Sequence, residues 1–220
     1  NGDDDKLSTV KTVNGKKPVF FGLDAKNDFY AKNIKNSGDG KVLATLCFDN
    51  NDIDVEIPAI GTYMVTNALA AAAAGKLLGL TDEEIANGVA SYKTVGSRAN
   101  VIDTGKIKII DDCYNANPTS VRASLDTLSN LDGRKVAILG DMKELGSEEL
   151  KLHFDTGVYA KSKDIGTVIT VGELAKELAK GADGKAFDTI EDAKSEILKT
   201  IKSGDVVLVN ASHSMQFENI

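Results

Sequence analysis

One stretch decides the fold of this chain: KIKIIDDCYNANPTSVRASLDTLSNLDGRKVAILGDMKELG, residues Lys106–Gly146. The isoleucine-rich run over residues 106–112 predicts a buried strand, and the apolar run over residues 135–140 predicts a second one. Between them, residues 117–131 have the composition of a helix with Pro118 near its first turn. Apolar strands separated by a helix are typical of a parallel sheet that helices cover on both faces.

The same alternation continues to the end of the chain. Strands are predicted over residues 167–172, 185–189 and 205–210. Helices are predicted over residues 147–163, with Ser147 as the N-cap, and over 173–182 and 190–204. We therefore expect residues 100–220 to form a Rossmann-like α/β domain with a mostly parallel sheet.

Residues 1–99 have a different pattern and are expected to form a separate unit. Polar turns over residues 36–41 and 49–52 separate strands predicted at 18–23, 42–48 and 53–59. Two helices then follow. The first is alanine-rich and buried, over residues 65–80, and the second covers residues 81–92 with Thr81 and Glu84 in a capping-box pattern. We place the domain boundary near residues 96–100, which gives domains 1–99 and 100–220.

Composition excludes several classes of function. The 220 residues have a formal net charge of −7 with acids and bases interspersed, which argues against a nucleic-acid partner. No apolar run approaches about 20 residues, so membrane insertion is not expected. Cys47 and Cys113 match no metal or redox spacing, and reduced cytoplasmic thiols are favoured over a disulfide. Asn1 is not a start methionine, and we expect the chain to begin inside a longer protein.

Three polar clusters follow predicted strands: DDCYNANP, GDMKELGS and NASHSMQF. Ligands of open α/β sheets bind beyond the carboxyl ends of the strands, so these clusters predict one ligand-binding rim. The alternative is that the Asp and Asn side chains cap the helices that follow, and for any single residue both interpretations stay open. The candidate rim residues are Asp111, Asp112, Asn115, Asn117, Asp141, Lys143, Ser212 and His213.

No self-contained phosphate-binding loop is found in the sequence. The Gly-Lys pairs are never followed by Ser or Thr, and no G-x-G-x-x-G follows a strand. The two histidines lie in different elements and form no metal-binding spacing, and His153 is expected to be exposed or half-buried. Asn67 is either a helix-start residue or a ligand contact. Arg98 is either a surface charge or a phosphate contact.

Three segments together resemble the Mur ligase family: GTYMVTNALAAAAAGKLLGL (61–80), DDCYNANPTSVRASLDTL (111–128) and AILGDMKELG (137–146). The resemblance covers essentially the whole chain, including NGDDDKL (1–7), which is similar to the family's N-x-D-D segment. The D-D-x-Y-N-A-N-P block is similar to the branch that attaches D-alanyl-D-alanine to UDP-N-acetylmuramoyl-tripeptide in peptidoglycan synthesis. The resemblance implies that residues 1–99 are the β-rich and helical latter part of a P-loop-type ATPase domain.

The resemblance implies an ATP-dependent amide-bond ligase that works through an acyl phosphate. It implies ATP contacts for Asn67 at the adenine, Arg98 at the phosphates, and Asp112 or its neighbour Asp111 at the ribose. The implied substrate contacts are Tyr114, Asn115, Asn117, Lys143, Ser212 and His213. It also implies Mg²⁺ whose ligands, like the P-loop, lie mainly upstream of this chain. The expected protein is a cytoplasmic monomer, and this chain alone is expected to be inactive.

Two departures from the family pattern limit what can be carried over. Tyr63 and Met64 stand where the family often has His-Asn, and Asn210 replaces a lysine that usually ends the last strand. The alternatives are a related ligase, such as folylpolyglutamate synthetase or another Mur ligase, and a freestanding non-catalytic nucleotide- or peptide-binding module. The upstream sequence distinguishes them, because the ligase needs a G-K-[ST] loop before Asn1.

Overall fold

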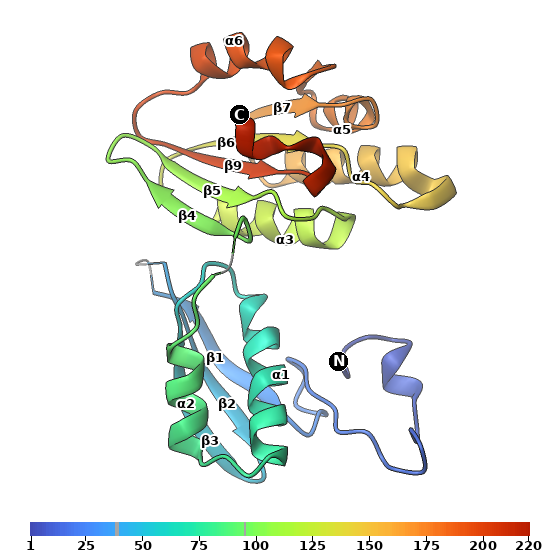
Figure 1. Cartoon of the computed structure of the whole chain (residues 1–220), viewed down its shortest axis with the longest axis vertical. Coiled ribbons are helices and arrows are strands. Elements are labelled where there is room, and N and C mark those ends of the chain that lie inside the picture. Colours follow the sequence, from blue (N-terminus) through green and yellow to red (C-terminus); the bar gives the residue numbers. More distant parts are fainter. Residues whose placement is uncertain (38–39, 95) are drawn as a thin grey trace. The chain divides into compact units, whose positions relative to one another are not determined.

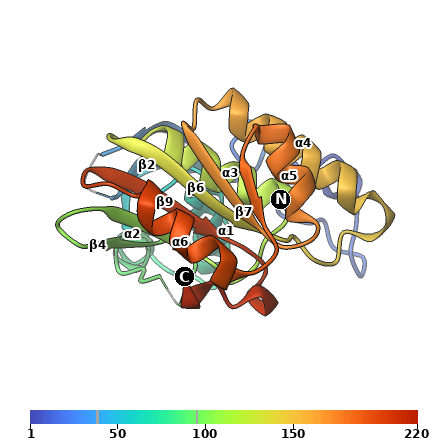
Figure 2. The ribbon, with the colours of Figure 1, turned by 90° about the horizontal axis from the view of Figure 1, so that it is seen from above.

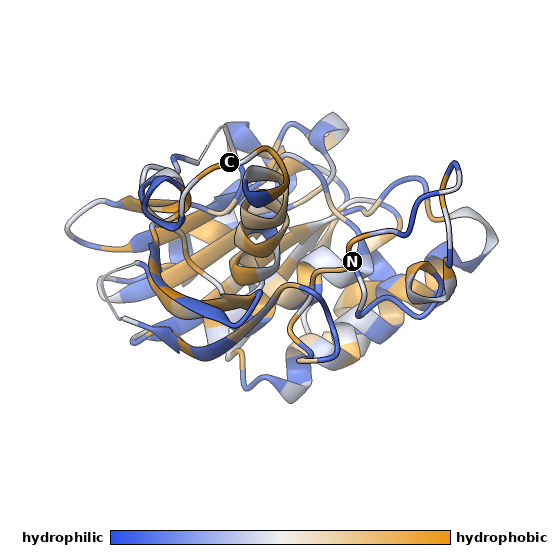
Figure 3. Cartoon of the chain, turned by 90° about the horizontal axis from the view of Figure 1, so that it is seen from below, coloured by the Kyte–Doolittle hydropathy of each residue, from blue (hydrophilic) through white to orange (hydrophobic). Residues whose placement is uncertain are grey.

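The computed structural model describes residues 1–37, 40–94 and 96–220. The chain folds into two compact units, Asn1–Lys93 and Thr94–Ile220, and each is described by itself (Figure 1). The helices of the chain carry both hydrophobic and hydrophilic residues (Figure 3).

The first unit contains an antiparallel sheet in the order β1-β2-β3, formed by β1 (Tyr30–Asn36), β2 (Val42–Phe48) and β3 (Asn51–Ile57). A turn lies within the predicted range 49–52, but it is confined to Asp49 and Asn50, at φ values of 48° and 62°, because Asn51 and Asp52 already belong to β3. These residue types tolerate the left-handed region that such a turn needs. The turn predicted over 36–41 includes Gly38 and Asp39, which lie outside the described residues.

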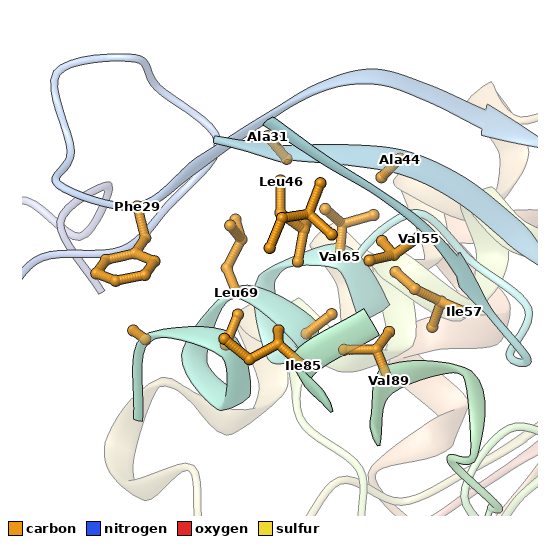
Figure 4. Close-up of a cluster of buried hydrophobic side chains, with 14 of the residues drawn as sticks. Phe29, Ala31, Ala44, Leu46, Val55, Ile57, Val65, Leu69, Ile85 and Val89 are labelled. Carbon is orange, nitrogen blue, oxygen red and sulfur yellow. The ribbon is translucent and has the colours of Figure 1, made fainter. Parts of the chain in front are cut away.

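Helices α1 (Met64–Leu77) and α2 (Asp82–Ala90) pack on this sheet, and their side chains form its core (Figure 4). Leu69 of α1 and Ile85 of α2 lie against Leu46 of the central strand and the β3 residues Val55 and Ile57. The predicted capping box is confirmed, because Thr81 Oγ1 accepts from the Glu84 N–H while the Glu84 carboxylate accepts from the Thr81 N–H.

The strand predicted over residues 18–23 is wrong, and β1 lies instead at Tyr30–Asn36. The Phe20 N–H donates to the Asp28 carboxylate rather than to a neighbouring strand, and an isolated bridge joins Phe21 to Phe29. The sequence of β1, YAKNIKN, does not alternate between apolar and polar residues. The pairing register of this strand shifts between Lys32 and Lys35, which interrupts the alternation of its two faces. A short helical turn, η1 (Leu7–Thr9), precedes these residues.

The second unit is built on a six-stranded sheet in the order β4-β5-β9-β6-β7-β8. Its strands are β4 (Asn100–Asp103), β5 (Lys108–Asp112), β6 (Arg134–Gly140), β7 (Thr167–Val171), β8 (Lys185–Phe187) and β9 (Asp205–Asn210). All neighbours are parallel except β4 and β5. The predicted mostly parallel sheet is therefore confirmed, with an antiparallel edge strand, β4, that was not predicted.

Helices cover both faces of this sheet, as predicted (Figures 1 and 2). One face is covered by α3 (Pro118–Ser129), α4 (Glu149–Ser162) and α5 (Ala175–Ala182). The other is covered by α6 (Ile190–Thr200), whose Ala193 and Ile197 share a core with Val136 and Ile138 of β6. From β5 to β8 the chain moves outward in one direction, and it then returns to place β9 between β5 and β6. Because each crossover between parallel strands is right-handed, the outward crossovers place α3, α4 and α5 on one face and the returning crossover places α6 on the other.

The predicted N-cap at Ser147 is wrong. The turn η2 (Gly146–Glu148) precedes α4, so Ser147 lies inside that turn, one residue before the N-cap Glu148. Two further turns, η3 (His213–Met215) and η4 (Phe217–Asn219), follow β9.

Candidate functional site

The three polar clusters predicted to share a rim do follow three adjacent strands. β9 pairs in parallel with β5 on one side and with β6 on the other. In that register Asn210 lies opposite both Asp112 of β5 and Leu139 of β6. The carboxyl ends of these strands therefore meet at one edge of the sheet, at the position where β9 returns between two strands that moved apart. Such a reversal of strand order is where ligands bind in open α/β sheets.

Asp112 is the centre of a hydrogen-bond network at this edge. Its Oδ1 accepts from the Ala99 N–H at 3.0 Å, and its Oδ2 accepts from Ser124 Oγ at 2.6 Å and from Asn210 Nδ2 at 2.9 Å. Burial, which disfavours the charged form, raises the pKa of Asp112 against the lowering effect of these donors. The sequence did not lead us to predict Ser124 as a residue of this network. The signal that could have revealed it is the spacing of Asn117, Ser120 and Ser124, which places all three on one face of α3.

Asp111 and Asp112 lie on opposite faces of the sheet, because successive strand residues alternate. Asp111 faces the α6 side, where it lines an apolar cavity of about 470 Å³ with Ile109 and Cys113. Its Oδ1 is buried and has no hydrogen-bond partner among the described residues. Burial and the nearby Asp111 charge raise the pKa of the Cys113 thiol. Because they lie on opposite faces, the two aspartates cannot both contact the same ribose. Asp112 is the aspartate on the face that α3 covers.

Arg98, Tyr114 and His213 form an exposed stack beside this network. The Arg98 guanidinium carbon lies 3.6 Å from the centre of the Tyr114 ring. The Tyr114 and His213 ring centres are 5.9 Å apart, with the planes tilted by 31°. Tyr114 is 47% exposed, which is high for an aromatic side chain. The structure thus brings together predicted residues from three places in the sequence, and it leaves them accessible to a ligand.

Asn115 and Asn117 differ in what their side chains do. Asn117 is the N-cap of α3, since its side chain accepts from the Ser120 N–H at 2.9 Å while Ser120 Oγ accepts from the Asn117 N–H. The capping interpretation is therefore correct for Asn117. Asn115 is exposed, and its Oδ1 accepts from the adjacent Ala116 N–H, which leaves the side-chain amide facing solvent.

Asp141, Lys143 and Ser212 tie the loops after β6 and β9 together. The Lys143 N–H donates to Ser212 Oγ at 3.0 Å, and the Lys143 ammonium pairs with Asp141 Oδ2 at 2.7 Å. Asp141 is 2% exposed and also accepts from the Ala175 N–H at the start of α5. Asp141 and Ser212 are therefore part of the framework, whereas the Lys143 side chain remains 43% exposed.

His153 is fully buried, which corrects the expectation of an exposed or half-buried histidine. Its Nε2 accepts from the Met142 N–H at 2.9 Å, and its Nδ1 lies 2.7 Å from the Glu149 carbonyl oxygen, to which it donates. Both bonds require the neutral ring with its proton on Nδ1. The histidine holds the loop after β6 against α4. Its burial is hard to foresee, because α4 has little apolar periodicity that would mark its buried face.

Asn67 belongs to the first unit and lies in the first turns of α1. It is exposed, and its side-chain amide lies 3.4 Å from Met64 Sδ. Together with Met64, Ala71, Gly88 and Tyr92 it lines an apolar cavity of about 370 Å³ between α1 and α2. The position does not cap α1, whose N-cap is Tyr63.

The described part of the chain shows neither a metal-binding cluster nor a membrane-spanning helix. Residues 1–37, 40–94 and 96–220 contain no group of three His, Cys, Asp or Glu side chains that could hold a metal ion. Within the same ranges, every helix is too short or too polar to cross a lipid bilayer.

Models of two protein families match the chain. The model described as the Mur ligase middle domain matches residues 1–75. The model described as the Mur ligase, glutamate ligase domain, matches residues 97–213.

Two similar curated proteins carry the name UDP-N-acetylmuramoyl-tripeptide–D-alanyl-D-alanine ligase. The protein of Bacillus subtilis is 33% identical over 91% of this chain and 45% of its own length. That of Escherichia coli is 31% identical over 100% of this chain and 50% of its own length. The chain therefore spans about half the length of the curated relatives it matches.

Solved structures are similar as well. The MurF ligase of Thermotoga maritima in complex with ADP has a TM-score of 0.85 at 26% identity, covering 99% of this chain and 50% of that one. A MurF structure from Acinetobacter baumannii has a TM-score of 0.83 at 30% identity, covering 90% of this chain and 44% of that one.

Proposed function

This chain belongs to the Mur ligase family, and from that membership we propose that the protein it forms part of is an ATP-dependent peptide ligase. In the proposed reaction, the tripeptide of UDP-N-acetylmuramoyl-tripeptide is extended by D-alanyl-D-alanine. The observation that carries the proposal is the polar rim at the ends of β5, β9 and β6, which contains the D-D-x-Y-N-A-N-P block. Relatives with the D-alanyl-D-alanine ligase name support this substrate pair.

The proposed chemistry has two steps. The terminal carboxylate of the tripeptide attacks the γ-phosphorus of ATP, forming an acyl phosphate and releasing ADP. The amine of D-alanyl-D-alanine then attacks the acyl carbon, and the tetrahedral intermediate expels inorganic phosphate as the amide forms. The protein contributes by orienting the reactants and by stabilising the negative charge of the phosphoryl group.

We assign the nucleotide contacts to three of the predicted residues. Arg98 has a planar guanidinium suited to phosphate oxygens, and no hydrogen bond or salt bridge occupies it among the described residues. Asp112 is assigned to the ribose hydroxyls, for which Oδ1 keeps one acceptor position beside the Ala99 N–H. Asn67 is assigned to the adenine edge. The ADP complex of the similar Thermotoga maritima structure supports a nucleotide ligand.

We assign the amino substrate to the exposed part of the rim. Asn115 and His213 offer accessible polar groups, and Lys143 offers a half-exposed ammonium for a carboxylate. Asn117 and Ser212 support these residues from the framework, since their side chains are already hydrogen-bonded.

The described residues do not by themselves fit a Mg²⁺ site, so we assign no step in this chain to the metal. Because ATP and UDP-linked sugars are cytoplasmic metabolites, we propose a cytoplasmic protein. We also propose that it is a monomer, which is independent of this reasoning.

The proposal is tested by measuring ADP release from the whole ligase. We expect ADP only when ATP, UDP-N-acetylmuramoyl-tripeptide and D-alanyl-D-alanine are all present, with one amide bond formed per ADP. If ADP release required a single amino acid instead of the dipeptide, the protein would belong to another branch of the family. Absence of any amine-dependent ADP release would refute the ligase function.

A further inference from the structure

The segment Ser97–Ala99 is attached to the end of β5 by hydrogen bonds on both sides of Arg98. The Tyr114 N–H donates to the Ser97 carbonyl at 3.0 Å, and the Ala99 N–H donates to Asp112 Oδ1 at 3.0 Å. The next residue, Asn100, begins β4 and pairs with Asp111. Because these contacts bracket it, the backbone of Arg98 is fixed to the rim of the second unit.

Ala99 has a φ of 51°, in the left-handed region that alanine rarely adopts. This conformation brings the Cβ atom close to the backbone, and it persists only where surrounding contacts maintain it. The bond from Ala99 to the Asp112 carboxylate is such a contact. The backbone reversal at Ala99 sends the chain into β4 while Arg98 stays over the end of β5.

The side chain of Arg98 is held separately, by the face of the Tyr114 ring. At 3.6 Å from the ring centre the guanidinium is within cation–π range and stacks closely. Stacking uses the flat face of the guanidinium and leaves its N–H donors free in the plane for an anion. His213, which follows β9, lies beside the Tyr114 ring, with the two ring centres 5.9 Å apart.

We propose that Tyr114 is a positioning residue that aims the Arg98 guanidinium, rather than a contact of the amino substrate. The identity of the anion, the phosphates of ATP, rests on the proposed function. The positioning itself rests only on the stack and on the hydrogen bonds of residues 97–99. It explains why a large aromatic side chain remains half-exposed at the rim, where a substrate contact alone would accept a smaller polar group.

The stack is tested first by NMR in the 220-residue chain, where ring currents from Tyr114 shift the Arg98 side-chain protons upfield. We expect Tyr114→Phe to retain that shift and Tyr114→Leu to abolish it. Phe154→Leu, which alters an aromatic residue of similar exposure on α4, is the matched control and should leave it unchanged. An Arg98 shift that is the same in the native protein and in both Tyr114 variants would overturn the proposal.

Kinetics of the whole ligase then separate positioning from substrate contact. We expect Tyr114→Leu to raise the KM for ATP about two- to fivefold, with Tyr114→Phe retaining most of the native value. In an Arg98→Ala background, Tyr114→Leu should have no further effect on that KM. A rise in the KM for D-alanyl-D-alanine alone would overturn the proposal and make Tyr114 a substrate contact. If the NMR shift behaves as expected but Arg98→Ala leaves the KM for ATP unchanged, the positioning stands and the phosphate assignment fails.

Discussion

The two ends of the parallel sheet in the second unit use polar residues differently. Where β6 and β9 begin, Arg134 and Asp205 bind each other, and neighbouring backbone groups complete the set. Where β5, β6 and β9 end, some polar side chains are equally occupied, but Arg98, Tyr114 and His213 remain exposed. Polar residues at strand ends therefore do not indicate a ligand site by themselves. What distinguishes the carboxyl end is that exposed groups stand beside a hydrogen-bonded framework, in which two buried oxygens, Asp111 Oδ1 and Asn210 Oδ1, have no partner among the described residues.

The largest loss of stability is expected from breaking the Arg134–Asp205 pair at the amino end of the sheet, which we call the closed end. Asp205 is 3% exposed and binds Arg134 through two bonds, Nε at 2.9 Å and a terminal nitrogen at 2.5 Å. Asp205→Ala removes a buried carboxylate that accepts from the half-exposed Arg134 side chain and from the Lys202 N–H, and losing these charge-assisted hydrogen bonds should lower the free energy of unfolding by about 3 kcal/mol. Urea denaturation measures this. Asp155→Ala, which removes a surface pair on α4, is the control and should cost below about 0.5 kcal/mol. Equal costs would mean that burial of the Asp205 carboxylate is unimportant.

Substitution of His153 tests how much the hydrogen-bonded loops at the carboxyl end of the sheet, the open end, contribute to stability. His153→Ala removes two hydrogen bonds and leaves a cavity beside the loop after β6, so we expect a loss of about 2–3 kcal/mol. Leu150→Ala, at an exposed position of the same helix, should cost far less. Chemical denaturation of both variants decides this, and a His153→Ala protein as stable as Leu150→Ala would contradict the framework role.

Asp112 should give a smaller, pH-dependent effect. Its folded-state pKa is raised by burial, so its contribution to stability is present below the ordinary aspartate pKa and is lost as pH rises through the folded value. Asp112→Asn cannot ionise, and the unpartnered Asn210 Oδ1 can accept from the new amide after Asn210 rotates. The stability of Asp112→Asn relative to the native protein should therefore increase between about pH 4 and pH 7, as followed by denaturation at each pH. A difference that does not vary with pH would show that the buried carboxylate is not disfavoured.

Ala99 should give the smallest effect. Glycine adopts a positive φ without steric cost, so Ala99→Gly should raise the free energy of unfolding by no more than about 1 kcal/mol. Ala99→Val places a β-branched residue in the same conformation and should lower stability instead. Thermal unfolding of the two variants, measured side by side, tests whether the backbone at the rim is strained. Both variants moving in the same direction would rule that out.

Much of this molecule was predictable from sequence, and the failures have physical causes. Apolar runs located β5, β6, β7 and β9, and the position of polar clusters after them located the rim. Strand β1 was missed because its polar residues and shifted register hide the alternation. Residues 18–23 are apolar but make only an isolated bridge, between Phe21 and Phe29, and a bond from the Phe20 N–H to the Asp28 carboxylate. Hydrogen-bond partners were less predictable. Asn117 and Asp111 resemble ligand contacts in sequence, and only their geometry shows that one is a cap and the other lies on the opposite face.

We expect the exposed groups at the carboxyl end of the sheet to bind nucleotide, and the Arg134–Asp205 pair at the amino end only to stabilise the fold. The most direct measurement is the KM for ATP of the whole ligase with one arginine removed from each end, Arg98→Ala or Arg134→Ala. We expect Arg98→Ala to raise this KM at least about tenfold, the effect of losing a charged phosphate contact, without loss of stability. Arg134→Ala should lower stability and leave the KM for ATP within about twofold of the native value. Equal KM values in the two variants would contradict the account.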